Sequence, residues 1–277
     1  MTCTPSNPKP RRWLRPVAAA VVALLSGAAQ AQARASLEIL PTLGGNSSRA
    51  YGLSDSGLVV GVADVGGVDR AFKWLPGAGM EELPTFGSGA SWARDSIGVG
   101  LGIVGGVQAG GLVATAWING QPTSVPGVSG TPSLATDIAD NGQRVVGWSR
   151  IGAQDRAFMA GVGNTVADLG HLGGGSSQAW GVNNGFQVVG QSFNGTAERA
   201  FLWQAGSGML DLGHLGGGGS RALGINNPGQ VVGASSNGSA ERAFLWQAGA
   251  GMVEIGTKLN GNSAANAIND TGLVIKH

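Results

Sequence analysis

The sequence predicts an all-β chain of tandem four-stranded antiparallel repeats, which we interpret as a six-bladed β-propeller with an incomplete last blade. Three observations predict this fold. Tryptophans recur every 43 residues, each unit divides into four short β-type segments, and many of the 51 glycines fall between those segments as turn residues. Four antiparallel strands in about 43 residues is the size of a propeller blade.

The 43-residue period is carried by residues that return at one place in each unit. Tryptophan occupies that place at Trp74, Trp117, Trp203 and Trp246, with Ala160 in the remaining copy. The segments Leu169–Asp211 and Leu212–Glu254 are identical at 31 of 43 positions. Such internal identity indicates the duplication of one structural unit.

The four β-type segments are clearest in one copy, as Arg221–Ile225, Gln230–Ala234, Arg242–Trp246 and Met252–Ile255. Counting from a fourth-type segment at Leu37–Leu40, the chain contains 23 such segments, one fewer than six full blades need. Ring closure removes exposed strand edges, which favours a propeller over the alternative, an open β-solenoid-like array.

Residues 1–33 differ from the repeats. They combine a basic head, an apolar run and two Ala-x-Ala cleavage sites, at Lys9 to Arg15, Pro16 to Leu25, and Ala29 to Ala33. The apolar run is shorter than the ~20 residues that span a membrane. The sequence therefore predicts a signal peptide at 1–33, a single β-repeat domain at 34–277 without a transmembrane segment, and a secreted protein, extracellular, periplasmic or on the cell surface.

The charge balance changes once the leader is set aside. The whole chain has 17 basic and 16 acidic residues, and four of the basic ones lie within residues 1–33. The remainder has 13 basic and 16 acidic residues, a net charge of −3, so we expect no nucleic-acid partner. The only cysteine, Cys3, is in the leader, so packing must hold the repeat domain together.

The repeat motifs resemble those of a known family. Leu-Gly-His-Leu-Gly-Gly, then Gly-Ile-Asn-Asn-Pro-Gly-Gln-Val-Val-Gly, then Ala-Phe-Leu-Trp is similar to the HAF repeats of bacterial extracellular proteins, named for a His-Ala-Phe tripeptide. This chain has Arg-Ala-Phe instead, at Arg70, Arg156, Arg199 and Arg242. The resemblance covers nearly all of 34–277 and implies secretion and β repeats, but no role of the family's histidine is carried over.

Several motifs suggest chemistry but have simpler structural explanations. Gly100–Gly105 matches G-x-G-x-x-G, yet it lies on a predicted hairpin and strand with no helix to receive a nucleotide. His171 and His214 occupy equivalent places and are too few for a zinc site, so we expect them in turns. Asp55, Asp140 and Asp270 precede turn glycines, where aspartate bonds its own backbone. We therefore predict no metal and no cofactor.

An acidic residue precedes each repeated arginine, as Asp69, Asp155, Glu198 and Glu241. Neighbours on a strand point to opposite faces, so each arginine cannot easily pair with the acid beside it. A partner on the next strand or the next blade is more natural. We interpret these arginines as an ion ladder that stabilises the stacked repeats.

One column of the first predicted strands differs in every copy: Tyr51, Arg94, Asp137, Trp180, Leu223 and Asn266. The residue before it is alanine in five copies and Thr136 in the other. Alternation puts the two columns on opposite faces of the strand. If first strands line an axis, Tyr51, Arg94, Asp137, Trp180 and Asn266 form a candidate binding site. The alternative is an ordinary solvated or loosely packed face.

The sequence contains no assembled catalytic motif: no G-x-S-x-G, no H-E-x-x-H and no cysteine beyond the leader. We therefore expect a non-enzymatic protein that binds a polysaccharide, the cell envelope or a cell-surface protein. The alternative is a propeller-type hydrolase or lyase with its site at the channel mouth. Arg94, Asp95 and Asp137 are the candidate residues for that alternative.

Overall fold

The computed structural model describes residues 39–98, 102–126, 132–161, 165–256 and 261–276, and every element with defined bounds in them is a β-strand. The strands form six antiparallel sheets in chain order, which we call blades 1 to 6. Blade 1 contains β1 (Ser48–Leu53), β2 (Val59–Val65), β3 (Val68–Leu75) and β4 (Gly79–Glu82). Blade 2 contains β5 (Ser91–Ser96), β6 (Ile103–Gln108), β7 (Leu112–Ile118) and β8 (Gln121–Ser124).

The later blades repeat this order. Blade 3 contains β9 (Ser133–Ile138), β10 (Arg144–Ile151), β11 (Gln154–Gly161) and β12 (Val166–Asp168). Blade 4 contains β13 (Ser177–Val182), β14 (Val188–Phe193), β15 (Glu198–Gln204) and β16 (Gly208–Asp211). Blade 5 contains β17 (Ser220–Ile225), β18 (Val231–Ser236), β19 (Glu241–Gln247) and β20 (Gly251–Glu254), and blade 6 contains β21 (Ala265–Ile268) and β22 (Val274–Lys276).

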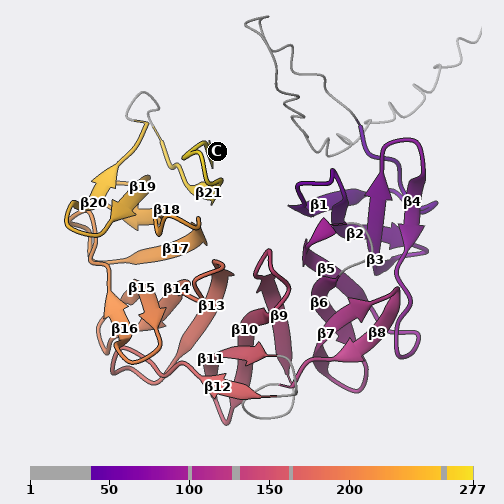
Figure 1. The fold of residues 1–277 in the computed structure, drawn as a ribbon, viewed down its shortest axis with the longest axis horizontal. Helices are drawn as coiled ribbons and strands as arrows, with labels where there is room; N and C mark the ends of the chain where they lie inside the picture. The colour runs from indigo at the N-terminus through magenta and orange to yellow at the C-terminus, as the bar shows by residue number, and fades with distance from the viewer. Residues whose placement is uncertain (1–38, 99–101, 127–131, 162–164, 257–260, 277) are drawn as a thin grey trace, which may run out of the picture.

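The blades are arranged as an open ring (Figure 1). The first strand of each blade lies on the inner side and the fourth strand on the outer side, and a gap separates blade 6 from blade 1. Successive first strands contact each other around the inside, from β1 through β5, β9, β13 and β17 to β21. The predicted all-β propeller with an incomplete last blade is confirmed.

One predicted strand is wrong. The segment Leu37–Leu40 was expected to be a fourth-type strand, but residues 39 and 40 lie outside any strand, and residues 37 and 38 are outside the described part of the chain. A fourth strand needs a third strand beside it, and the described part of blade 6 contains only β21 and β22. Leu40 is nevertheless buried against Val59 and Phe72 of blade 1.

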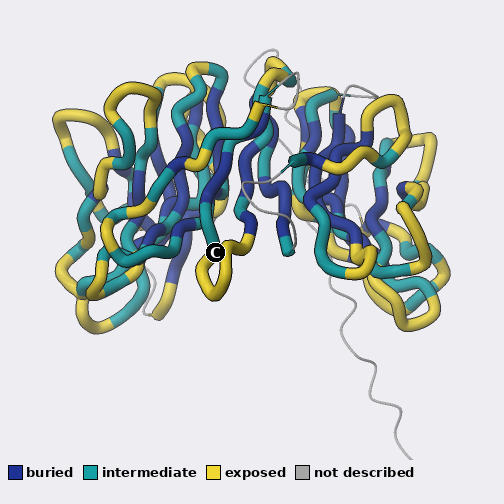
Figure 2. Tube along the Cα trace, turned by 90° about the horizontal axis from the view of Figure 1, so that it is seen from below, coloured by how far each residue is buried: buried dark blue, intermediate teal, exposed yellow. Residues whose placement is uncertain are grey.

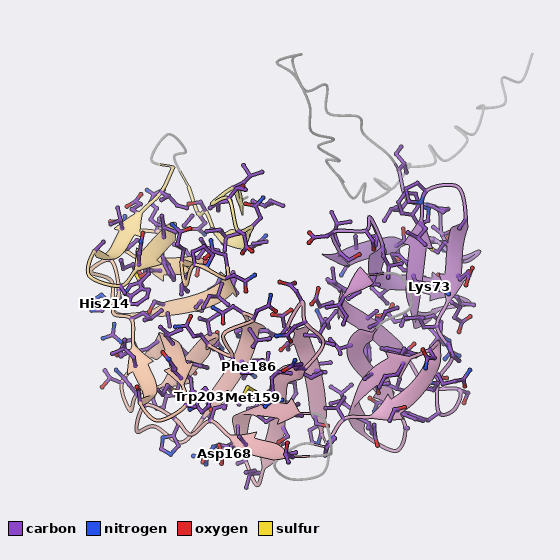
Figure 3. The ribbon with its side chains drawn as sticks, viewed as in Figure 1. Lys73, Met159, Asp168, Phe186, Trp203 and His214 are labelled. Atoms are coloured by element: carbon purple, nitrogen blue, oxygen red, sulfur yellow. The ribbon has the colours of Figure 1, made fainter. Side chains whose placement is uncertain are left out.

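The hydrophobic core is divided into layers between successive blades. An aromatic residue of the third strand fills such a layer in blades 2 to 5, namely Trp117, Phe158, Phe201 and Phe244. Trp203 and Trp246 lie in the same layers, with Trp203 beside Met159 between blades 3 and 4 (Figure 3). In blade 1, Phe72 and Trp74 pack instead with Leu40. Figure 2 shows the buried segments along the strands and the exposed ones in the connecting turns. Packing between repeats therefore stabilises the ring.

From blade 2 onward, a serine at or just before the start of the first strand links each blade to the preceding one. The Oγ atoms of Ser91, Ser133, Ser177, Ser220 and Ser263 accept the backbone N–H of Ala71, Ala114, Ala157, Ala200 and Ala243, at 2.9 to 3.1 Å. Each of these serines is almost completely buried. The linkage satisfies an amide that would otherwise be buried without an acceptor.

The second strands need glycine where they face the first strand. A Cβ atom at Gly190 would lie 2.0 Å from the carbonyl oxygen of Gln178 and 2.9 Å from a ring carbon of Phe201. Gly233 has the same surroundings one repeat later. The repeated Val-Val-Gly motif thus reflects a close approach of backbones.

The predicted signal peptide at 1–33 lies outside the described residues. Within the part of the chain that the structure describes, no helix has the length and apolar character needed to cross a membrane.

Candidate functional site

A β-bulge interrupts the first strand of every blade. The pairing of β13 with β14 skips Trp180, because Ala179 pairs with Gly190 and Gly181 pairs with Val189. The corresponding bulged residues in the six first strands are Tyr51, Arg94, Thr136, Trp180, Leu223 and Asn266. We call this set the inner column. A bulge leaves one residue unpaired and redirects its side chain, so this position can vary between copies without disturbing the sheet.

The structure corrects the assignment of Asp137 to the candidate column. Asp137 pairs with Val146, and the bulged residue of β9 is Thr136. Strand β9 begins one residue early relative to the 43-residue period, as Ser133 shows by taking the linking role of Ser91 and Ser177. The following turn is one residue longer than in blade 4, which restores the period from β10 onward.

In blades 1 to 5, the residue after the bulge faces the next blade at close range. Glycine or alanine occupies this place in four blades, as Gly52, Gly181, Gly224 and Ala267. A Cβ atom at Gly52 would lie 2.9 Å from the Cα of Asp95, and one at Gly224 would lie 3.4 Å from the Cα of Ala267. Blades 2 and 3 instead carry Asp95 and Asp137, so two carboxyl groups enter a layer that small residues fill elsewhere.

The two aspartates form one hydrogen-bonded pair. Asp95 Oδ2 accepts the backbone N–H of Ile138 at 3.3 Å, Asp137 Oδ2 accepts that of Val182 at 2.7 Å, and the two side chains are hydrogen-bonded to each other. The pair therefore links blades 2, 3 and 4 through their inner strands.

The surroundings of this pair favour the protonated form. Each aspartate keeps some exposed surface, but protein atoms crowd around its carboxyl group. This burial raises the pKa of Asp137 well above 3.8, and the negative charge of Asp95 raises it further. Burial also raises the pKa of Asp95, although the hydrogen bond from Asp137 and backbone amides opposes this. Asp140 is a further nearby charge that acts on Asp95. The pair therefore holds a proton more tightly than an isolated aspartate does.

Arg94 and Tyr51 form a stacked pair between blades 1 and 2. The guanidinium carbon of Arg94 lies 4.5 Å from the centroid of the Tyr51 ring. Tyr51 is 42% exposed, whereas Arg94 is half-buried and its Nε is buried without a hydrogen-bond partner. Sequence reasoning selected both residues but did not foresee their contact.

Trp180 supplies a second donor of this kind, since its Nε1 is buried without a hydrogen-bond partner. Leu223 is half-buried and Asn266 is exposed. Thr136 instead donates to backbone, with Oγ1 2.9 Å from the Ala179 oxygen and 3.1 Å from that of Val146. The inner column therefore contains two buried donors that have no acceptor among the described residues.

The turns after the first strands contact one another at one end of the ring. Asn184 N–H donates to Asn227 Oδ1 at 2.8 Å, and Asn227 N–H donates to Asp270 Oδ1 at 2.8 Å. Asp140 lies 3.4 Å from the side-chain amides of both asparagines. Asp140 and Asp270 thus bond turn residues of other blades, and Asp55 lies in the corresponding turn of blade 1.

A second arginine stack in this region was not predicted from the sequence. The guanidinium carbon of Arg144 lies 4.7 Å from the centroid of the Phe186 ring. Phe186 has a φ of 60°, in the left-handed region where the equivalent turns of blades 1 and 5 have Gly57 and Gly229. A phenylalanine at a glycine position is a departure from the repeat, but no signal in the sequence connected it to Arg144.

The repeated arginines of the third strands are structural. Each pairs with the acid twelve residues later on its own fourth strand, in the pairs Arg70–Glu82, Arg156–Asp168, Arg199–Asp211 and Arg242–Glu254. Asp168 lies at the outer side of the ring (Figure 3). Arg70 also donates to the carbonyls of Ser88 and Gly89, in the connection to the next blade.

The histidines lie in turns. His171 Nδ1 accepts the backbone N–H of Gly173 at 2.9 Å and of Gly175 at 3.1 Å, and His214 repeats this with Gly216 and Gly218. His214 lies on the outer side of the ring (Figure 3). Across the described ranges, no group of three or more His, Cys, Asp or Glu side chains is arranged to hold a metal ion.

Comparisons with known proteins identify the fold. No protein-family model and no curated protein matches the chain. Among solved structures, it is similar to TolB from Acinetobacter baumannii, with a TM-score of 0.52, 14% identity and coverage of 72% of this chain and 51% of that one. It is also similar to a protein assigned as TolB from Agrobacterium tumefaciens, with a TM-score of 0.58, 12% identity and coverage of 75% and 79%. The chain thus spans about half the length of the first relative, and these likenesses establish a propeller-type fold.

Proposed function

We propose that this chain is an exported, non-catalytic binding protein that holds a segment of a partner protein at the inner face of its ring. The inner column carries this proposal. Its residues differ in every blade within a framework that otherwise repeats, and Arg94 and Trp180 have buried donors without partners. Positions that repeat serve the packing of blades, which leaves the varied positions available for a ligand.

The chemistry of the column supports a protein partner. Tyrosine, arginine and tryptophan dominate the binding energy of protein interfaces, and the column contains one of each in Tyr51, Arg94 and Trp180. A polysaccharide partner would require aromatic faces open for stacking, yet Trp180 is half-buried and Tyr51 already stacks with Arg94. The apolar leader of residues 1–33 and the resemblance to HAF repeats support export.

The aspartate pair argues against a glycoside hydrolase. Glycoside hydrolases hold their two carboxyl groups roughly 5 to 10 Å apart to admit a sugar or a water molecule. Asp95 and Asp137 are in direct hydrogen-bonding contact, and each also accepts a backbone amide. Such a pair resembles an internal hydrogen-bonding link more than the two separated groups of a glycoside hydrolase.

Site-specific photo-crosslinking tests the proposal. A photoreactive phenylalanine replaces Leu223 in the inner column, and a matched variant carries it at Leu210, an exposed residue on the outer strand β16. Each purified variant is irradiated with the extracellular and periplasmic proteins of the producing bacterium. We expect one defined crosslinked protein from position 223 and none from 210. Equal crosslinking at both positions, or none at 223, would contradict the proposal.

A glycan array separates the alternative ligand class. We expect the purified chain to give no signal above background. Specific binding that disappears in the Tyr51→Ala, Trp180→Ala double variant would replace the protein partner with a polysaccharide.

A further inference from the structure

We infer that Arg94, held by Tyr51, is the receptor for a carboxylate on the partner's bound segment, so that the partner presents an aspartate or glutamate to the inner column. This inference rests on the proposed function and adds the chemistry of what is recognised. It is drawn from the contacts of Arg94 and from the acceptors that this residue lacks.

Arg94 differs from the arginines that stabilise the blades. Arg70, Arg156, Arg199 and Arg242 each form an ion pair with their own fourth strand. Among the described residues, Arg94 has neither a hydrogen-bond acceptor nor an ion-pair partner, and its one interaction is the stack on Tyr51. A half-buried guanidinium without an acceptor has lost part of its hydration and gained no hydrogen bond in return.

The stack with Tyr51 leaves the hydrogen-bonding edge of the guanidinium free. A cation–π contact uses the flat face of the group, while its five N–H donors lie in the plane of that group. The 4.5 Å separation therefore fixes the orientation of Arg94 without consuming a donor. Such a pre-oriented fork matches the two oxygens of a carboxylate, which forms a charge-assisted and often bidentate pair with arginine.

The rest of the column fits a peptide better than a free anion. Trp180 and Leu223 are half-buried, and because Trp180 Nε1 is itself buried, both residues offer a partner apolar surface. A peptide with one acidic side chain can bond the guanidinium of Arg94 and place apolar groups against these two residues. We therefore assign the carboxylate to an acidic side chain of a protein segment.

Peptide display tests this assignment with an unbiased probe. Random dodecapeptides on phage are selected against the purified chain and, in parallel, against Arg94→Gln and Arg49→Gln variants. Arg49 is an exposed residue of β1, so its variant removes the same charge from the neighbouring inner strand. Because Arg94 has no hydrogen-bond partner and loses only its stack on Tyr51, we expect the Arg94→Gln chain to fold with a melting temperature lowered only slightly.

The expected result is an enriched peptide family with Asp or Glu at one fixed position, obtained from the unaltered chain and from Arg49→Gln but not from Arg94→Gln. A synthetic peptide of that family should bind Arg94→Gln about tenfold or more weakly, the range for a hydrogen bond to a charged group. Tyr51→Phe should keep the affinity because it keeps the ring, whereas Tyr51→Ala should lower it.

The failures of the two proposals are distinguishable. Enriched peptides without an acidic position, or acidic peptides that bind Arg94→Gln equally well, would overturn the carboxylate assignment and leave the binding function standing. If no peptide is enriched on any variant and position 223 gives no crosslink, both proposals are overturned.

Discussion

The carboxyl groups of Asp95 and Asp137 are hydrogen-bonded to each other across the boundary between blades 2 and 3. In blades 1, 4 and 5, the residue after the bulge is glycine and the inner strand packs closely against the backbone of the next one. The pair therefore replaces close packing with a polar link whose strength depends on one proton.

The pair predicts that the chain loses stability as the pH rises. The pKa of Asp137 is raised in the folded state above its ordinary value of 3.8, so between those two values the folded chain binds more protons than the unfolded chain. This contribution to stability is complete below about pH 3.8 and is lost as the pH rises through the folded pKa. Urea unfolding at a series of pH values should show this decline.

Asp137→Asn should remove that decline, because the amide donates to Asp95 as the protonated carboxyl does and its oxygen still accepts from Val182. The control, Asp95→Asn, should be less stable than Asp137→Asn at neutral pH. Asp95 accepts both from Ile138 and from Asp137, and one amide oxygen replaces its two carboxylate oxygens. If the stability of Asp137→Asn declined with pH as that of the unaltered chain does, a group other than Asp137 would cause the decline.

The serine link between blades predicts a defined loss of stability. Ser177→Ala leaves the buried N–H of Ala157 without an acceptor, which should lower the free energy of unfolding by about 1 to 3 kcal/mol. The matched control is Ser239→Ala in an exposed turn, where a change within about 0.5 kcal/mol is expected. Denaturant titration of both variants measures the difference, and equal values would show that the link contributes nothing.

The layered core predicts a large effect of one aromatic residue. Phe201→Ala empties a fully buried place beside Leu169 and Trp203, so it should lower the free energy of unfolding by about 3 to 5 kcal/mol. Leu210→Ala, at a residue that is 54% exposed, should change it by less than about 0.5 kcal/mol. Similar losses in both variants would contradict a core that lies between blades.

The close approach at Gly190 predicts that this glycine cannot be replaced. A methyl group there would lie 2.0 Å from a backbone oxygen of the neighbouring strand, so Gly190→Ala should abolish cooperative unfolding or sharply reduce the soluble yield. Gly87→Ala is the control, because a Cβ atom at Gly87 meets nothing within 4 Å. A Gly190→Ala chain with normal thermal unfolding would show that the strands can separate.

The 43-residue period predicted the strands, the blades and their order. It placed Asp137 wrongly because β9 starts one residue early and the turn after it is one residue longer, so the two shifts cancel. The spacing of the tryptophans and arginines is therefore unchanged. The position of Ser133 indicates this shift, because the other linking serines keep the 43-residue period and Ser133 lies one residue early. The sequence thus contained the shift, but only in a residue whose role depends on a neighbouring blade.

The contacts within the candidate site depend on the curvature of the ring. Tyr51 and Arg94 belong to different sheets, as do Asp95 and Asp137. Strand periodicity predicts which face each side chain takes, but not how closely two sheets approach. The two stacks and the carboxyl pair therefore could not be predicted from the sequence, whereas the variation at Tyr51, Arg94 and Trp180 could.

Hydrogen exchange on the complex is the most direct measurement of the central claim. The protein crosslinked at position 223 is purified and added to the unaltered chain, and amide exchange is followed by mass spectrometry. We expect slower exchange concentrated in the inner strands β1, β5 and β13, with the outer strands β16 and β20 unchanged. Protection confined to the outer strands would show that the partner binds another surface.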